Sequence, residues 1–300
     1  MCLCGKSKWY SKGKGNQKGG NVNPEIRRLN RVFHRLGHLL TAWMTVLVLG
    51  ILAAILVFLF INGAEKLSFN FFLESPIDLG REGGIFPILV STILLAMTSL
   101  FIAVPLGIGT AVYLTEYTTD SYVTLIIRFG AECLAGIPSI IFGLFGFMLF
   151  VVSLGMGWSI ISGGLTLACM VLPTIIRTSE EAIKSVPKVL REVGFSLGAT
   201  KSQVIWNIVL PHARGGIATG IILALGRVIG ETACVIFTTG ISLEMPTSLF
   251  DSARSMSVHF YLLAREGISM EMAYTTALAL VGMILIINSL AAFLSPRRTR

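Results

Sequence analysis

Two ionisable residues, Arg227 and Glu231, interrupt the apolar segment "GIILALGRVIGETACVIF" between Gly220 and Phe237. A charge at the centre of a bilayer costs about 2.5–3.5 kcal/mol on insertion scales, so it needs a partner or a function. Residues four apart share one face of a helix and can pair. Arginine also stays charged and offers a planar fork of donors that fits a tetrahedral oxyanion. The segment therefore predicts either a neutralised pair that holds helices together or a contact with a transported anion, to which Thr232 adds a hydroxyl.

A second pair of opposite charges has the same spacing. Arg128 and Glu132 lie at the start of another apolar run, close to its expected boundary with solvent, where a charge costs less. We interpret them as a structural salt bridge. Arg177 directly follows a further apolar run, where arginine usually anchors a helix at the membrane interface. The alternative for these three residues is a position on or near the path of a transported ion.

The composition indicates which elements must position these charges. Hydrophobic residues make up 54% of the 300 residues and charged residues 13%, which is about half the charged fraction of a typical soluble domain. A membrane-spanning helix needs about 20 largely apolar residues, and the alternation expected of a barrel strand is absent. The sequence predicts an all-α integral membrane protein with six transmembrane helices. The six apolar runs are residues 38–62, 86–113, 129–155, 157–176, 215–240 and 273–295.

The distribution of lysine and arginine predicts which side of the membrane each loop faces. Residues 1–37 hold nine of them, the loop 177–214 holds six and the tail 296–300 holds three, whereas the loops 63–85 and 241–272 hold two each. Loops rich in lysine and arginine stay in the cytoplasm. We therefore expect both termini and the 177–214 loop to be cytoplasmic, and the other two loops to lie on the outer side.

The amino-terminal tail, residues 1–37, is basic and of low complexity. We expect it to be disordered and to be attracted to anionic lipid. Nucleic-acid binding is disfavoured because the tail is joined directly to a membrane helix. Cys2 and Cys4 lie in this tail and the other three cysteines lie in apolar runs. None has the spacing of a zinc ligand with histidine, so no metal site is predicted.

The cytoplasmic loop predicts two short helices joined at a glycine. Ser185 is a candidate cap for the first helix, with Pro187 in its first turn. Gly198 suits the left-handed residue that ends a helix. Three apolar residues recur on one face of this first helix: Leu190, Val193 and Leu197.

The second of these helices begins with a Thr-x-x-Gln capping box formed by Thr200 and Gln203. We expect Pro211 to close it before the fifth span. Its apolar face consists of Val204, Ile205 and Ile208. A unit that is both amphipathic and basic indicates a surface for docking another protein, and a helix lying on the lipid surface is the alternative. The nearby "GFSLGATKS" lacks the spacing of a phosphate-binding loop, so ATP and its Mg are expected on a separate chain, and this chain is expected to bind no cofactor.

The same loop resembles the "EAA" loop of the binding-protein-dependent permeases of bacterial ABC importers. The matching positions are Glu192, Gly198, Ile208, Leu210 and Pro211. Ala199, Thr200 and Lys201 lie between these positions. Val193 and Gly194 depart from the family, which has two alanines there. The resemblance implies a six-helix type I (MetI-like) permease whose loop forms the coupling helices that insert into an ATPase subunit.

Further motifs resemble the PstA family of permease subunits of phosphate importers. These motifs are "GREGGIFPIL", "AVPLGIGTAVYLTEY", "LAGIPSIIFGLFG", "LPTIIRTSEEAIKSVPKVLREVGFSLGAT" and "GRVIGETA". They cover most of residues 80–240. The resemblance implies that Arg227, Glu231 and Thr232 lie on a phosphate path in the bacterial inner membrane. It also implies a second, PstC-like permease, PstB-like ATPase subunits and a PstS-like external phosphate-binding protein as partners.

Three other functions compete with this interpretation. A secondary transporter would leave the EAA-like loop unexplained and should show inverted repeats, which we do not find. An intramembrane enzyme is disfavoured because all four histidines lie at helix ends or in loops. An ABC importer for another oxyanion or small solute stays open, because the external binding protein commonly sets the selectivity.

Overall fold

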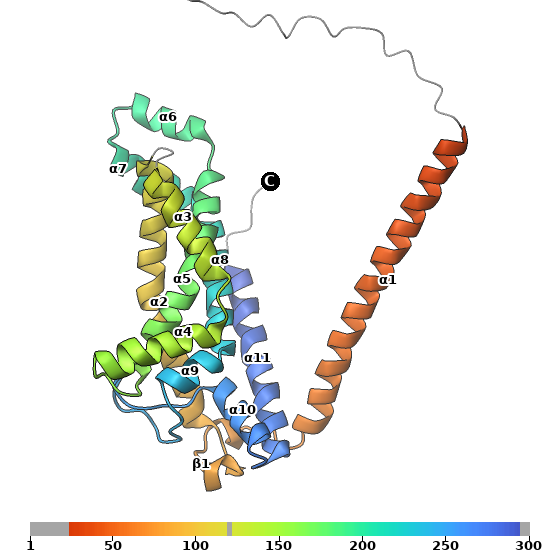
Figure 1. Ribbon diagram of the computed structural model, residues 1–300, viewed down its shortest axis with the longest axis vertical. Coiled ribbons are helices and arrows are strands. Elements are labelled where there is room, and N and C mark those ends of the chain that lie inside the picture. The colour runs from red at the N-terminus through yellow and green to blue at the C-terminus, as the bar shows by residue number, and fades with distance from the viewer. Residues whose placement is uncertain (1–23, 119–121, 295–300) are drawn as a thin grey trace, which may run out of the picture. The chain divides into compact units, whose positions relative to one another are not determined.

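The computed structural model describes residues 24–118 and 122–294 (Figure 1). The chain divides into two compact units, one up to Val57 and one from Phe58 onward, and the division falls inside the first helix. That helix begins at Pro24, within the tail predicted to be disordered. The remainder of both predicted tails, with Cys2 and Cys4, lies outside the described residues.

The described part of the chain is almost entirely helical, with short 3₁₀ or π turns written as η. In chain order the elements are α1 (Pro24–Gly63), η1 (Asn70–Phe72), β1 (Pro76–Ile77), η2 (Asp78–Gly80), β2 (Glu82–Gly83), α2 (Phe86–Val112), η3 (Tyr113–Tyr117), α3 (Tyr122–Ala135), α4 (Ser139–Gly146), η4 (Phe147–Ser153), α5 (Ile160–Lys184), α6 (Lys188–Ser196), α7 (Lys201–Val204), η5 (Ile205–Val209), α8 (Leu210–Gly230), α9 (Ala233–Thr238), α10 (Met256–Arg265) and α11 (Met270–Leu294). The two strands form a small antiparallel hairpin.

Among the described residues, five helices are long and apolar enough to cross a membrane, and a bent pair supplies a sixth candidate. The all-α, six-span prediction is therefore confirmed in outline, with two corrections inside the spans. The third predicted span, 129–155, is not one continuous helix. Instead α3 and α4 meet at an angle of 103°, and Figure 1 shows α4 lying across the bundle. The break falls at Gly136–Pro138, because the residue before a proline is pushed out of the helical conformation and proline cannot donate a backbone hydrogen bond.

The fifth predicted span, 215–240, differs at both ends. It was expected to start after a stop at Pro211, but α7, η5 and α8 form one helix from Lys201 to Gly230. The wide π turn η5 ends at Val209, two residues before Pro211, where a regular helix would need the hydrogen-bond donor that proline lacks. At its other end the helix stops at Gly230, and a separate short helix, α9, follows.

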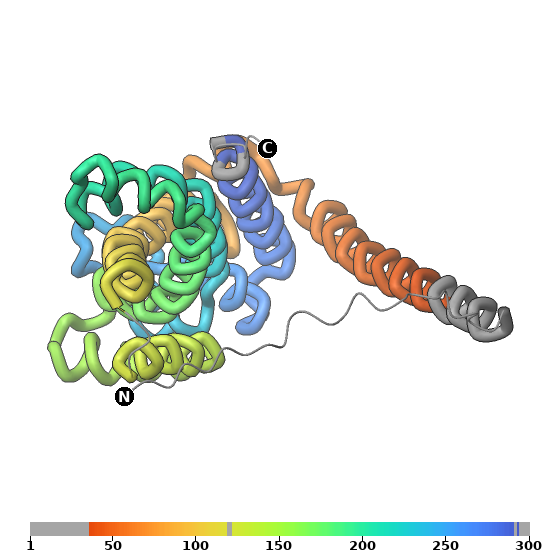
Figure 2. Tube along the Cα trace, turned by 90° about the horizontal axis from the view of Figure 1, so that it is seen from above, coloured from red at the N-terminus to blue at the C-terminus, as the bar shows by residue number. Residues whose placement is uncertain are grey.

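Close packing of α2 against α5 forms the centre of the bundle, and Figure 2 shows the two helices side by side. Glycines make the approach possible: a methyl group at Gly107 would lie 2.6 Å from the Ile175 side chain, and one at Gly164 would lie 2.6 Å from that of Thr98. At the end of the bundle opposite α6 and α7, a second core packs α10 and α11 against the segment around Phe71. The bundle thus has a tight centre and two differently built ends.

The α2–α5 contact yields a test with a control on the same helix. We expect Gly107→Ala to lower the free energy of unfolding by about 1–3 kcal/mol, the usual cost of overpacking a core. A methyl group at Gly109 would meet no atom within 4 Å, so Gly109→Ala should be neutral or slightly stabilising. Denaturant titration of the purified protein in detergent measures both, and equal effects of the two changes would contradict this packing.

Candidate functional site

The segment that carries Arg227 and Glu231 is the broken end of a helix. Glu231 has an extended backbone (φ −73°, ψ 130°) and follows the last helical residue, Gly230. The helical spacing assumed for the pair therefore does not apply. Arg227 Nε and Glu231 Oε1 still face each other, but at 4.0 Å, the outer limit of an ion pair. Thr232 continues the break before α9.

Neighbouring helices satisfy the groups exposed by this break. The Ser139 hydroxyl, at the start of α4, donates to the Glu231 carboxylate, and the Ser257 hydroxyl of α10 donates to the Glu231 backbone carbonyl. The helix α4 also passes so close to α9 that a methyl group at Gly143 would lie 3.0 Å from the Cys234 Cα atom. The two broken spans therefore support each other, and Glu231 is tied down while Arg227 is not.

A cavity of about 420 Å³ lies between α3 and α5 and is lined by six charged side chains. These are Arg128, Glu132, Arg177, Glu180, Glu181 and Lys184. Glu180 is the centre of the cluster, because its Oε1 lies 2.8 Å from Arg128 Nη2 and 2.6 Å from Lys184 Nζ. Three residues predicted as path or interface positions thus share one cavity.

The predicted Arg128–Glu132 bridge is corrected by this arrangement. Arg128 turns toward Glu180 on α5, and Glu132 has no ion pair among the described residues. Arg128 pairs with Glu180 on another helix because Glu180 is almost buried and needs a counter-charge, whereas Glu132 is exposed to solvent. Arg177 makes an exposed 3.5 Å pair with Glu181 one turn later on its own helix.

The loop of residues 177–214 has the predicted internal architecture. Thr200 accepts from the Gln203 backbone N–H, and the Gln203 side chain accepts from the Thr200 N–H, so the capping box is confirmed. Gly198 is left-handed (φ 81°), as predicted. The first helix is capped differently, since Pro187 is the N-cap residue of α6 and the Ser185 hydroxyl bonds to Ala182 at the end of α5.

The exposed face of α6 is apolar. Val204 and Ile205 are buried as predicted, and Leu190 packs against the same core cluster as Val204. Val193 is exposed and Leu197 is 83% exposed, so only the Leu190 part of the predicted apolar face is packed. Gly194 packs instead: a methyl group there would lie 2.7 Å from the end of the Ile208 side chain. The departure at Gly194 thus lets α6 approach the next helix closely.

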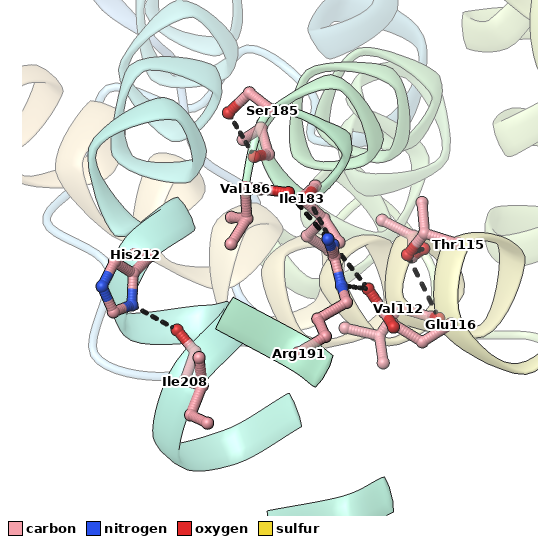
Figure 3. Close-up of polar contacts among 11 residues, drawn as sticks. Val112, Thr115, Glu116, Ile183, Ser185, Val186, Arg191, Ile208 and His212 are labelled. Atoms are coloured by element: carbon pink, nitrogen blue, oxygen red, sulfur yellow. Dashed lines mark hydrogen bonds and ion pairs between the residues drawn. The ribbon is translucent and has the colours of Figure 1, made fainter. Parts of the chain in front are cut away.

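Sequence reasoning missed the residue that fixes the loop to the bundle, Arg191. Figure 3 shows its guanidinium between the ends of α2 and α5. It donates to Glu116 Oε1 through Nε (3.1 Å) and Nη2 (2.9 Å), and to the backbone carbonyls of Val186 (2.7 Å) and Ile183 (2.9 Å). Arg191 and Glu116 are 75 residues apart, so no local pattern could have paired them.

Tyr117, the residue after Glu116, contacts a second basic side chain of the loop. Lys201 lies 5.0 Å from the centre of the Tyr117 ring, within the range of a cation–π interaction. Lys201 was predicted as a coupling-loop residue, and the structure points it inward, onto η3. Two consecutive residues, Glu116 and Tyr117, therefore anchor α6 and α7 to the second span.

Comparison with known proteins assigns the family. The family model of the binding-protein-dependent transport system inner membrane component matches residues 103–300. The chain belongs to this permease family. It is accordingly a multi-pass inner-membrane subunit of an ABC importer, and the EAA-like loop lies inside the matched region.

Named relatives of this permease fall into more than one group. It is 37% identical to the probable ABC transporter permease protein YqgI of Bacillus subtilis, over 72% of this chain and 80% of the relative. It is 36% identical to the phosphate transport system permease protein PstA 1 of Mycobacterium tuberculosis, over 73% and 72%. It is also 34% identical to the phosphate transport system permease protein PstC of Haemophilus influenzae, over 72% and 78%.

A solved structure shows the same fold. The permease matches a chain of a bacterial alginate ABC transporter crystallised with its periplasmic protein, with a TM-score of 0.66 and 18% identity, over 91% of this chain and 98% of that one. At that identity the likeness concerns the fold alone, and it confirms the predicted type I permease architecture.

The Arg191–Glu116 contact in this permease can be tested by a double-mutant cycle. Breaking one partner of a buried, hydrogen-bonded charge pair costs about 2–5 kcal/mol, so Arg191→Gln and Glu116→Gln should each lower the free energy of unfolding by that range. The double variant should lose much less than the sum of the two.

The exposed pair Arg177–Glu181 is the matched control. Both of its side chains are more than two-thirds exposed, so the same cycle should give about 0–1 kcal/mol. Additive losses at Arg191 and Glu116 would show that the two residues are not coupled.

Proposed function

We propose that this permease forms half of the translocation pathway of an ATP-driven phosphate importer. The observation that carries the proposal is Arg227, a half-buried arginine at a helix break whose nearest carboxylate is 4.0 Å away. A guanidinium held so loosely keeps donors free for an oxyanion. Relatives named as phosphate transport permeases support phosphate as that oxyanion.

Glu231 moderates the field of Arg227 in this mechanism. Its carboxylate is held by Ser139 and lies close enough to weaken the arginine's attraction for phosphate without neutralising it. Transport requires such weakening, because an ion that binds too tightly is not released. Thr232 lies in the same break and supplies a hydroxyl that can donate a hydrogen bond to the anion.

The charged cavity supplies the inner end of the path. Its three basic and three acidic side chains balance, so it gives a leaving anion a polar surrounding without a strong trap. In this role Arg177 is the most weakly paired basic residue of the cavity, because its ion pair with Glu181 is exposed and 3.5 Å long. Arg128 is fixed by its ion pair with Glu180 and lines the cavity together with Glu132.

The exposed apolar residues of the coupling loop form the ATPase contact. Val193 on α6, Leu197 directly after it and Trp206 on η5 are exposed, and Glu192 adds an exposed carboxylate. This patch fits a PstB-like ATPase, which binds the ATP and Mg. The loop then lies in the cytoplasm, as do both termini.

Two further partners complete the importer. A PstC-like permease encloses the other half of the path, and a PstS-like binding protein delivers phosphate at the opposite end of the bundle. ATP binding closes the ATPases, moves α6 and α7, and opens the path outward. Release of phosphate inward follows hydrolysis.

Arg227→Gln should abolish phosphate uptake while the subunits still assemble, because glutamine keeps a polar side chain but removes the charge and the fork. Uptake of labelled phosphate by cells carrying the complete importer measures this. Arg214→Gln, at an exposed arginine on the same helix, is the matched control and should transport normally. Unchanged uptake by the Arg227 variant would refute the proposed contact.

Leu197→Asp should weaken retention of the ATPase about tenfold or more, since burying a carboxylate at an apolar interface is costly. Folding should be unaffected because Leu197 is exposed in the subunit. Co-purification of the ATPase with the permease gives the readout. Phe69→Asp, at an equally apolar and exposed residue at the other end of the bundle, should retain the ATPase fully. Equal retention by both variants would argue against this docking surface.

A further inference from the structure

A buried arginine lies in the loop before α10 without a carboxylate partner. Only 7% of the surface of Arg254 is exposed. Its Nε donates to the Ile241 carbonyl (2.9 Å) and its Nη1 to His259 Nδ1 (3.3 Å). None of the ion pairs among the described residues includes it. An uncompensated buried charge is expensive, so this arrangement calls for an anion from outside the chain.

His259 adds an unsatisfied donor beside this charge. Arginine can only donate, so His259 Nδ1 must accept and the proton of the neutral ring lies on Nε2. Burial and the nearby Arg254 charge lower the pKa of His259 to about 3, which keeps the ring neutral. The ring is fully buried, and its Nε2 has no hydrogen-bond partner in the described part of the chain.

A strained turn covers this histidine. Asp78 and Leu79 both have positive φ, 48° and 59°, and are followed by Gly80 at 91°. Non-glycine residues in this region cost about 1–3 kcal/mol each. A methyl group at Gly80 would lie 2.5 Å from His259 Cε1, so the backbone of the turn rests directly on the ring. A turn held under strain over an unsatisfied donor is suited to move aside.

A short polar connection leads from this place to the broken helix. Ser255 directly follows Arg254 and shares a hydrogen bond of 2.9 Å with Ser257. Ser257 in turn donates to the Glu231 carbonyl. The start of α10 thus joins the buried arginine to the residues proposed to carry the anion.

We propose that Arg254, positioned by His259 and covered by the Asp78–Gly80 turn, is an outer oxyanion site that receives the anion before Arg227 does. The anion is a tetrahedral oxyanion, because the guanidinium and the neutral imidazole N–H both donate and the positive charge of the guanidinium repels a cation. That this oxyanion is phosphate rests on the proposed function. The site faces the end of the bundle opposite the coupling loop, where the binding protein releases its ligand.

The test uses the complete importer with its partner subunits in proteoliposomes, supplied with the binding protein loaded with labelled phosphate. Arg254→Gln should lower phosphate uptake roughly 10- to 100-fold, the range for losing a charge-assisted hydrogen bond. ATP hydrolysis stimulated by the binding protein should stay near the wild-type rate, so less phosphate is carried per ATP. Arg254→Lys keeps the charge, so its phosphate uptake should lie between that of Arg254→Gln and that of the wild type. Arg265→Gln, at an exposed arginine on the helix that follows, should behave as wild type.

Variants of the positioning residue guard against a simple folding defect. His259→Gln keeps an acceptor for Arg254 and a spare donor and should retain most of the uptake per ATP. His259→Leu removes both and should reproduce the Arg254→Gln defect. Assembly yield is compared by size-exclusion chromatography for every variant.

Three results would overturn the proposal. They are normal uptake per ATP in Arg254→Gln, a parallel fall of uptake, ATP hydrolysis and assembly in both Arg254 variants, and equal behaviour of the two His259 variants. Failure of the proposed function gives a different result from failure of the Arg254 site. If the proposed function fails, the wild-type importer carries no phosphate while still hydrolysing ATP. In that case the same variants are measured with sulfate as the labelled oxyanion, and an unchanged Arg254→Gln again overturns the site.

Discussion

The break of the fifth span at Glu231 is the constraint on which the rest of the site depends. A backbone can leave the helical conformation at membrane depth only where protein groups satisfy its freed donors and acceptors. Here α10 satisfies the Glu231 carbonyl through Ser257, and α4 reaches the carboxylate through Ser139. The broken α3–α4 span therefore lies where it can support the break between α8 and α9.

One uninterrupted helix links this break to the coupling loop. The residues from Lys201 to Gly230 form a single helix, which at about 1.5 Å per residue is long enough to cross the membrane. Its amino-terminal end is anchored to η3 through Lys201 and Tyr117, and the neighbouring α6 is anchored through Arg191. In the proposed mechanism, a continuous helix would pass a displacement of this loop to Arg227, whereas a helix interrupted at Pro211 would absorb it.

Features that depend on residues close together in the sequence could be predicted from the sequence. The capping box at Thr200 and the left-handed Gly198 depend on spacings of a few residues and were predicted correctly, as were the positions of most spans. The failures share one cause, which is competition from distant residues. Arg128 has a carboxylate four residues away but pairs with Glu180, and Arg191 finds Glu116 across 75 residues. Electrostatic partners are chosen by burial and proximity in the folded chain, and neither can be read from a single sequence.

The arginines of the bundle differ in how far their charges are satisfied, and this difference separates structural from functional roles. Arg191 is compensated by a carboxylate and also donates to two carbonyls, which together use four of its five N–H donors. Arg227 has one carboxylate at the limit of pairing. Arg254 has a carbonyl and a neutral imidazole but no negative charge among the described residues. An added oxyanion should be attracted most strongly where compensation is weakest, so this contrast separates Arg191, a structural anchor, from Arg227 and Arg254, the two proposed anion contacts.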